Sequence, residues 1–157
     1  KPSLRSSEAS VSNDAFATPG SPERVAAALR RLHAGPRFRD DFDMVRTAER
    51  YLRVVDERDI PVPAGYRAHL PQLPRIEAAL AVHPLPSVPC HNDLLAANFI
   101  RGEQQLWMVD WEYAGMGDRY FDLGNFSVNN ELDEAGQAAL LEVYFGEGPG
   151  SRRLATL

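Results

Sequence analysis

The chain has 157 residues, of which 44% are hydrophobic and 25% are charged, and its formal net charge is −5 at pH 7. This length suits one domain or one lobe of a larger protein, and an acidic chain without a basic stripe argues against nucleic-acid binding as its main role. A single cysteine, Cys90, excludes an internal disulfide framework, and the lack of a membrane-length apolar run or a signal-peptide core makes the cytoplasm the expected compartment.

The first part of the chain is expected to be a linker followed by helices. Residues 1–20 are rich in Ser, Ala and polar residues, which is typical of a linker. A Ser-Pro-Glu start at residue 21 supplies a cap, a proline in the first turn and an acid near the helix start, and predicts a helix over 22–34. Helical spacing of apolar residues predicts a second helix over about 40–58 and a third over 66–82, whose first half contains two prolines.

Strands and turns are expected from residue 87 onward. Residues 87–90 are predicted to form a short strand, and a turn between the strands 98–101 and 106–110 predicts a hairpin. A glycine-rich loop follows at 114–118. Two more helices are expected, over 119–129 and 133–145. The predicted fold class is therefore α+β, with helices surrounding a small hairpin.

The most informative motif lies between the first strand and the hairpin. His91, Asp93 and Asn98 follow the spacing H-x-D-x-x-x-x-N, and Asp110 comes twelve residues later, at the expected end of the hairpin. This order matches the catalytic loop and metal-binding acid of kinase-type phosphoryl transfer. It predicts that Asp93 orients and deprotonates a substrate hydroxyl, while Asn98 and Asp110 offer Mg²⁺ the hard oxygen ligands it prefers.

The residues around this motif have a structural and a functional interpretation. A lone Asp or Asn in a loop is most often a turn or cap residue. The predicted catalytic site therefore depends on Asp93, Asn98 and Asp110 occurring together at this spacing, and not on any one of them. His91 is expected to support the loop by hydrogen bonding rather than to carry a proton. Glu112 and Tyr113 follow the metal-binding segment, where an acid and an aromatic ring suit a cationic substrate. The nearby Trp111 and Phe121 are expected to belong to the core.

One part of a kinase-like enzyme is missing from the sequence. Lys1 is the only lysine, and the chain contains neither G-x-G-x-x-G nor G-x-x-x-x-G-K. Kinase-like enzymes grip the nucleotide phosphates with a strand lysine ahead of the catalytic loop. The chain is therefore expected to lack the N-terminal nucleotide lobe, to form a C-terminal lobe over 21–157 that is incomplete at its C-terminus, and to be inactive alone.

Three segments resemble the choline/ethanolamine kinase branch of the aminoglycoside phosphotransferase-like kinases, and they cover residues 91–98, 109–115 and 121–125. Residues 29–33 also resemble this family's helix after the hinge between the two lobes. The resemblance implies ATP-dependent phosphorylation of choline or ethanolamine with Mg²⁺ as cofactor. It assigns Asp93 as the base, Asn98 and Asp110 as metal ligands, and Tyr113 to the substrate site. Asp122 resembles the buried acid that supports the catalytic loop in this family.

Two other functions remain open at this point. The first is a kinase of the same superfamily that acts on an aminoglycoside or another small hydroxylated molecule, because an acidic pocket suits any such amine. The second is a non-catalytic kinase-like binding module, which the missing lysine favours and the intact Asp93, Asn98 and Asp110 oppose. The expected partners are ATP and a small amino alcohol, and a homodimer is compatible with the sequence.

Overall fold

The computed structural model describes residues 21–102 and 105–146. The expected linker over 1–20 and the chain beyond residue 146 lie outside the described residues. None of the described helices is long and apolar enough to cross a membrane.

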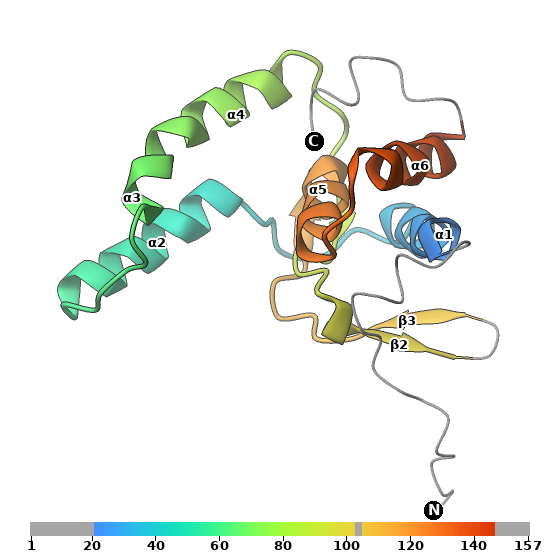
Figure 1. The fold of residues 1–157 in the computed structure, drawn as a ribbon, viewed down its shortest axis with the longest axis horizontal. Coiled ribbons are helices and arrows are strands. Elements are labelled where there is room, and N and C mark those ends of the chain that lie inside the picture. Colours follow the sequence, from blue (N-terminus) through green and yellow to red (C-terminus); the bar gives the residue numbers. More distant parts are fainter. Residues whose placement is uncertain (1–20, 103–104, 147–157) are drawn as a thin grey trace, which may run out of the picture.

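Three helices form the core of the lobe. α1 (Ser21–His33) packs along α6 (Glu134–Phe145), and α5 (Arg119–Asn129) lies beside them (Figure 1). Asp118 and Asp133 each cap the helix that follows them, by accepting a hydrogen bond from a backbone N–H of its first turn. The largest fully buried apolar side chains are Val25, Leu29, Leu94, Phe99, Leu123, Phe126, Leu140 and Leu141. The three helices thus provide the surface on which the loop 91–98 rests.

Two small antiparallel sheets flank this loop. β1 (Val88–Cys90) pairs with β4 (Gly115–Gly117), with Pro89 opposite Met116. β2 (Phe99–Arg101) pairs with β3 (Leu106–Met108), with Ile100 opposite Trp107. The loop therefore begins where one sheet ends and finishes where the other begins.

The strand boundaries correct three expectations. The segment 114–118 is not simply a loop, because it contains β4, which pairs with β1. Asn98 does not begin a strand but closes the short 3₁₀ turn η3 (Ala96–Asn98). The second hairpin strand ends at Met108 and stops short of Asp110, whose φ of 64° lies in the left-handed region and turns the backbone away from the strand direction.

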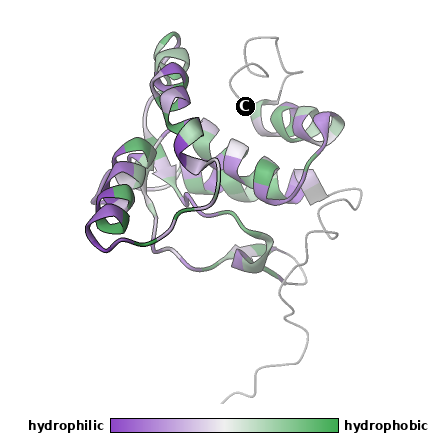
Figure 2. Cartoon of the chain, turned by 60° about the vertical axis from the view of Figure 1, so that its left-hand side comes forward, coloured by the Kyte–Doolittle hydropathy of each residue, from purple (hydrophilic) through white to green (hydrophobic). Residues whose placement is uncertain are grey.

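A helical arm projects from the core. It consists of α2 (Met44–Glu57), α3 (Tyr66–His69), the 3₁₀ turn η2 (Leu70–Gln72) and α4 (Leu73–Ala81), and none of these elements contains a buried residue. Figure 1 shows the arm to one side of the α1, α5 and α6 cluster, and Figure 2 shows polar and apolar residues mixed along its helices. The expected helix over 66–82 is divided, because a 3₁₀ turn that contains Pro71 separates α3 from α4.

The start of the arm is fixed by the backbone of β4. The N–H of Phe42 donates to Met116 O at 2.8 Å, and the N–H of Met116 donates to Asp40 O at 2.9 Å. Asp43 then caps α2 by accepting a hydrogen bond of 3.0 Å from the N–H of Arg46. The expected helix over 40–58 is therefore wrong at its start, because residues 40–42 are extended against β4 and the helix begins only at Met44.

Candidate active site

The backbone immediately before Asp93 is hydrogen-bonded to a buried carboxylate. Asp122, on the first turn of α5, is fully buried. Its Oδ2 accepts a hydrogen bond of 2.9 Å from the N–H of His91, and its Oδ1 accepts one of 2.7 Å from the N–H of Asn92. Asn92 has a φ of 67°, in the left-handed region that few non-glycine residues adopt. The two bonds therefore hold an uncommon turn immediately before Asp93.

Two asparagines, one within α5 and one just after its C-terminal end, form hydrogen bonds with the backbone of Leu94, the residue after Asp93. Asn125 Oδ1 accepts a hydrogen bond of 2.6 Å from the N–H of Leu94. Asn130 Nδ2 donates to Leu94 O at 2.9 Å and to Phe126 O at 2.8 Å. Leu94 itself is fully buried in the core. Asp93 thus lies between two backbone positions that α5 holds in place, and its own side chain remains half-buried.

The structure brings Asp93 and Asn98 together. Asn98 Nδ2 donates to the backbone O and to Oδ2 of Asp93, each at 2.9 Å. Because the amide nitrogen makes both bonds, the amide oxygen of Asn98 takes no part in the pair. Asn98 is buried except for 7% of its surface, so its orientation is set by Asp93. The arrangement leaves one hard oxygen of Asn98 for another ligand.

Asp110 follows directly after the residue that pairs with Asn98. The N–H of Val109 donates to Asn98 O at 3.0 Å, which extends the hairpin ladder by one rung. Asp110 then leaves the strand with a left-handed backbone, and its side chain is exposed. The hairpin therefore carries Asn98 and Asp110 to the same end, although both lie just beyond the strands.

His91 lies beneath this end of the hairpin. Its Nε2 donates to Val109 O at 2.9 Å, and its ring centroid lies 4.5 Å from that of Trp111. His91 is fully buried, and its Nδ1 has no hydrogen-bond partner among the described residues. The side chain thus connects the start of the loop 91–98 to the segment that carries Asp110.

Glu112 and Tyr113 lie on the turn that follows Asp110. Glu112 is exposed, and Tyr113 is half-buried with its backbone O accepting a hydrogen bond of 2.9 Å from Asn92 Nδ2. The hydroxyls of Tyr113 and Tyr51 are 3.1 Å apart, and either can donate. This hydrogen bond, helped by the nearby acids Glu112 and Asp93, raises the pKa of Tyr113 to about 12. Tyr51 comes from α2, and nothing in the sequence indicated that the arm contacts the site.

A cavity of about 320 Å³ lies between the arm and the start of α5. Apolar side chains of both elements make up much of its wall, and the polar part of the wall consists of acids and one amide. The lining residues are Phe42, Asp43, Met44, Val45, Ile76, Glu77, Leu80, Asn92, Gly117, Asp118 and Phe121. Phe121, which was expected in the core, lines this cavity and is half-buried, and Trp111, assigned to the core on the same grounds, is 42% exposed.

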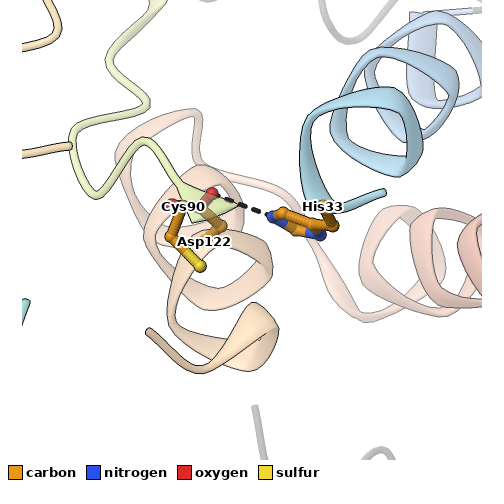
Figure 3. Close-up of side chains that lie close together, drawn as sticks. All are labelled: His33, Cys90 and Asp122. Atoms are coloured by element: carbon orange, nitrogen blue, oxygen red, sulfur yellow. Dashed lines mark hydrogen bonds and ion pairs between the residues drawn. The ribbon is translucent and has the colours of Figure 1, made fainter. Parts of the chain in front are cut away.

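A second buried group lies on the far side of Asp122. His33 Nε2 is 3.0 Å from Asp122 Oδ2, and His33 Nδ1 is 2.6 Å from the hydroxyl of Tyr144. Figure 3 shows His33 of α1 pointing at Asp122 of α5, with Cys90 of β1 beside them. His33 was not among the expected site residues, although residues 29–33 resemble a helix of the kinase family, because a single histidine 58 residues before His91 has no spacing that predicts this contact.

The same three residues have the composition of a metal site. One ligand atom from each of His33, Cys90 and Asp122 lies within 4.8 Å of the others. However, both Asp122 oxygens already accept hydrogen bonds, and His33 Nε2 makes one of them. Burial raises the pKa of the Cys90 thiol, which opposes the thiolate that a metal requires. The donor chemistry fits a hydrogen-bonded support better than a metal centre.

The described lobe combines a mainly helical core, a small hairpin and a catalytic-type loop clamped by a buried acid. These features define the larger lobe of a kinase-like phosphotransferase, and the expected α+β fold class is confirmed. Residues 7–157 match the phosphotransferase enzyme family, and the chain belongs to that family.

Three relatives illustrate the likeness. A solved structure of a choline/ethanolamine kinase family protein from Mesorhizobium loti is 35% identical, with a TM-score of 0.80 over 92% of this chain and 50% of that chain. A protein LicA homolog from Metamycoplasma hominis is 41% identical over 58 residues, which are 37% of this chain and 23% of the relative. A thiamine kinase from Shigella boydii is 33% identical over 106 residues, which are 68% of this chain and 37% of the relative.

The resemblance to choline/ethanolamine kinases is thereby confirmed at the level of the family and the fold. The chain spans half the length of the solved relative, and its matches cover 37% or less of these two curated relatives.

Proposed function

We propose that the full-length protein carrying this chain transfers a phosphoryl group from ATP to the hydroxyl of a small amino alcohol, choline or ethanolamine. The observation that supports this most directly is the Asp93–Asn98 pair, bonded at 2.9 Å on a loop whose backbone Asp122 holds. A carboxylate fixed beside a free amide oxygen is the arrangement that phosphoryl transfer requires. The likeness to a choline/ethanolamine kinase family protein supports the choice of acceptor.

Asp93 acts as the base in this proposal. Its half-buried carboxylate faces solvent on one side and is held by Asn98 on the other. A carboxylate so placed orients the acceptor hydroxyl and takes its proton as the new bond to phosphorus forms. Asn98 keeps the carboxylate in one orientation, so little reorganisation is needed at the moment of reaction.

Asn98 and Asp110 are the proposed ligands of Mg²⁺. The donor set fits this ion, because the Asn98 amide oxygen takes no part in the bonds to Asp93 and the Asp110 carboxylate is exposed. When bound, Mg²⁺ neutralises charge on the nucleotide phosphates. His91 supports both segments, because it begins the loop and donates to the residue before Asp110.

Glu112 and Tyr113 are the proposed acceptor-binding residues. An exposed carboxylate next to a phenol ring attracts a cationic nitrogen by charge and by its interaction with the ring face. A phenol is already protonated at physiological pH at its ordinary pKa of about 10, and the raised pKa of Tyr113 favours this neutral form further, so its hydroxyl keeps a proton to donate. The site thus favours an alcohol that also carries a positive charge.

Thiamine is a second candidate acceptor. The thiamine kinase from Shigella boydii matches this chain over 106 residues, a longer segment than the LicA homolog. Thiamine, like choline, joins a permanently charged nitrogen to a primary alcohol, so the same acid and aromatic ring suit both. The two candidates differ in size and not in the chemistry of transfer.

The first experiment tests turnover. The full-length protein is incubated with ATP, Mg²⁺ and choline, ethanolamine, thiamine or kanamycin, and ADP release is measured. We expect turnover with choline or ethanolamine, and we expect Asp93→Asn to lower kcat by about 10²- to 10⁴-fold because the base is lost. Asp133→Asn, at an exposed helix cap where Asn caps as well as Asp, is the control and keeps full activity.

Two results would contradict this proposal. Turnover of kanamycin without either amino alcohol would assign the protein to the antibiotic-kinase branch. A fully active Asp93→Asn variant would remove the proposed base. Turnover of thiamine alone would select the second candidate acceptor.

The second experiment tests the metal ligands. We expect Asp110→Ala to abolish the Mg²⁺ dependence of nucleotide binding in the full-length protein, as measured by calorimetry with and without Mg²⁺. Because Asp110 has a left-handed backbone that alanine rarely adopts, Asp110→Asn is included, since asparagine tolerates this conformation. Asp110→Ala should lose the effect and Asp110→Asn should weaken it, because asparagine keeps an oxygen donor but loses the charge, whereas Asp41→Ala, an exposed acid on another segment, should keep it. An unchanged Mg²⁺ titration in Asp110→Asn would refute the role.

A further inference from the structure

We infer that Asn92 fixes the distance between the base and the cation-binding turn, and so selects acceptors by the number of carbons between their hydroxyl and their nitrogen. The inference rests on the proposed function, in which Asp93 takes the hydroxyl while Glu112 and Tyr113 take the nitrogen. Asn92 directly precedes Asp93, and its side chain is hydrogen-bonded to the backbone of Tyr113. One residue therefore joins the two ends of the proposed acceptor site.

The backbone of Asn92 is itself held in place. Its N–H donates to Oδ1 of the buried Asp122 at 2.7 Å, and its φ of 67° lies in the left-handed region. Asparagine is one of the few residues with a side chain that adopt this conformation readily. Asn92 is only 6% exposed, so the neighbouring atoms restrict its side chain. The amide of Asn92 therefore extends from a backbone that is already fixed one residue before Asp93.

The side chain of Asn92 takes the place of a backbone donor between two segments. β1 and β4 pair antiparallel, and their last pair has Cys90 opposite Gly115. Two residues further on, the same register would place Asn92 opposite Tyr113. The left-handed turn instead directs the N–H of Asn92 to Asp122, and its side-chain Nδ2 donates to Tyr113 O at 2.9 Å. The amide thus continues the pairing beyond the two strands, as far as a proposed acceptor-binding residue.

The orientation of this amide follows from its partner. A backbone carbonyl can only accept a hydrogen bond, so the atom of Asn92 that faces Tyr113 O is the nitrogen. The amide oxygen of Asn92 has no hydrogen-bond partner among the described residues. Within this part of the chain, removal of the amide therefore breaks the bond to Tyr113 and leaves the other hydrogen bonds of the loop in place.

A fixed distance between the base and the cation-binding turn discriminates between acceptors of different length. In ethanolamine and in choline, two carbons separate the hydroxyl oxygen from the nitrogen. An acceptor with one more carbon cannot place both groups correctly when both ends of the site are held, and an extra methylene changes kcat/KM by about 10- to 200-fold in a well-fitted site. If the turn 111–114 moves freely relative to Asp93, the longer acceptor is accommodated and the shorter one binds more weakly. The bond from Asn92 therefore affects both affinity and selectivity.

The first test measures acceptor selectivity in the full-length protein. Asn92→Gly removes the amide but keeps the N–H that donates to Asp122 and the left-handed backbone, which glycine adopts freely. We expect the KM for choline or ethanolamine, whichever the wild type turns over, to rise about tenfold, since one buried hydrogen bond is lost. The preference for this acceptor over its homologue with one more carbon, taken as the ratio of the two kcat/KM values, should fall at least about fivefold.

The KM for ATP and a matched variant are the controls. The KM for ATP should change less than about twofold, because Asp110 is positioned by the hairpin rather than by Asn92. Asp59→Gly makes the same kind of replacement at an exposed left-handed residue between α2 and α3, and it should keep both the acceptor KM and the selectivity of the wild type.

The second test does not need activity. Amide hydrogen exchange is measured by NMR at His91, which donates to the buried acid of α5, and at Ala114, whose N–H donates to Trp111 O within the turn. In Asn92→Gly we expect Ala114 to exchange at least about fivefold faster while His91 stays protected, because the turn is released and the loop is not. If the wild type phosphorylates no amino alcohol, the proposed function fails and the selectivity fails with it, whereas the exchange rates still decide whether Asn92 fixes the turn.

Three results would overturn the inference. The first is a folded Asn92→Gly variant with the acceptor KM and the selectivity of the wild type. The second is unchanged exchange at Ala114. The third is an equal increase in exchange at His91 and Ala114, because the whole loop would then have loosened. If Asn92→Gly does not fold, Asn92→Asp replaces it and is measured at about pH 9, where an ionised carboxylate cannot donate to Tyr113 O. Wild-type KM and selectivity in that variant would also count against the inference.

Discussion

Tyr113 is the residue at which the arm meets the candidate acceptor site. Its ring lies near that of Phe42, with centroids 6.5 Å apart, and its hydroxyl is bonded to Tyr51 of α2. A phenol is neutral when protonated, so a shared hydrogen bond and the neighbouring acids Glu112 and Asp93 all favour the protonated form. The protonation state of Tyr113 is therefore influenced by α2, an element that the sequence did not connect with the site.

We predict that Tyr51→Phe lowers the pKa of Tyr113 from about 12 toward its ordinary value of about 10. Because folding raises the pKa of Tyr113, its phenol stays protonated up to about pH 10 in the wild type. In Tyr51→Phe the phenolate of Tyr113 should appear at a lower pH than in the wild type. A ¹³C NMR titration of the tyrosine rings measures this directly. Tyr66→Phe, on the exposed α3, should leave the titration of Tyr113 unchanged. An unaltered pKa in Tyr51→Phe would show that the hydrogen bond has no influence.

Individual site residues differ in how far the sequence reveals them. The motif of Asp93 and Asn98 has a fixed spacing, and the structure places these two side chains in contact. Their roles in catalysis and metal binding stay predictions. The contacts of His33 and Tyr51 have no such spacing signal, because each residue reaches the site through packing between elements that are distant in sequence. Contacts of this kind depend on how helices pack, which local spacing does not encode.

At the scale of elements, β4 determines how the arm leaves the core. Gly115 of β4 lies so close to Phe42 that a Cβ on this residue would be 2.9 Å from both the N and the Cβ of Phe42. Such contacts involve backbone atoms and cannot be relieved by a side-chain rotation. Glycine is therefore needed here for close approach of two backbones, and not for an unusual φ.

We predict that Gly115→Ala lowers the free energy of unfolding by about 1–3 kcal/mol, the usual cost of forcing an extra methyl into a packed site. Urea denaturation of the full-length protein, followed by circular dichroism, gives the change. Gly136→Ala is the matched control in α6, where the added methyl would meet only side-chain atoms, the nearest at 3.2 Å, and alanine favours the helix. Equal stability of Gly115→Ala and the wild type would show that the backbones can separate without loss.

Helices and strands were not equally predictable from the sequence. The helices α1, α5 and α6 match the expected ranges closely, because caps and apolar periodicity are local signals. The strand β4 was assigned to a loop, because Gly-Met-Gly has no strand signature and pairs only through contacts with β1 and residues 40–42. The start of α2 was misplaced for the same reason. Pairing between distant segments decided both outcomes.

At the scale of the whole molecule, the family and the fold class followed from a short part of the sequence. The segments 91–98, 109–115 and 121–125 sufficed to indicate a kinase-like lobe, and the match over residues 7–157 confirms it. The projection of the arm away from the three-helix core could not be predicted. An amphipathic sequence indicates that one face of a helix is packed, but it does not identify the element that packs against that face. The arm contributes Tyr51 to the site and one wall to the 320 Å³ cavity.

The arm and the core formed by α1, α5 and α6 are expected to differ in the free energy needed to unfold them. Its helices bury no residue completely, whereas α1, α5 and α6 share one continuous core. Segments with few buried contacts open with a smaller free energy than the core around which the chain folds. The arm is thus expected to open as a separate unit while Asp122 and the loop remain folded. The wall that the arm contributes to the 320 Å³ cavity would then be mobile beside a rigid base, so the cavity could change in size without disturbing the loop that carries Asp93.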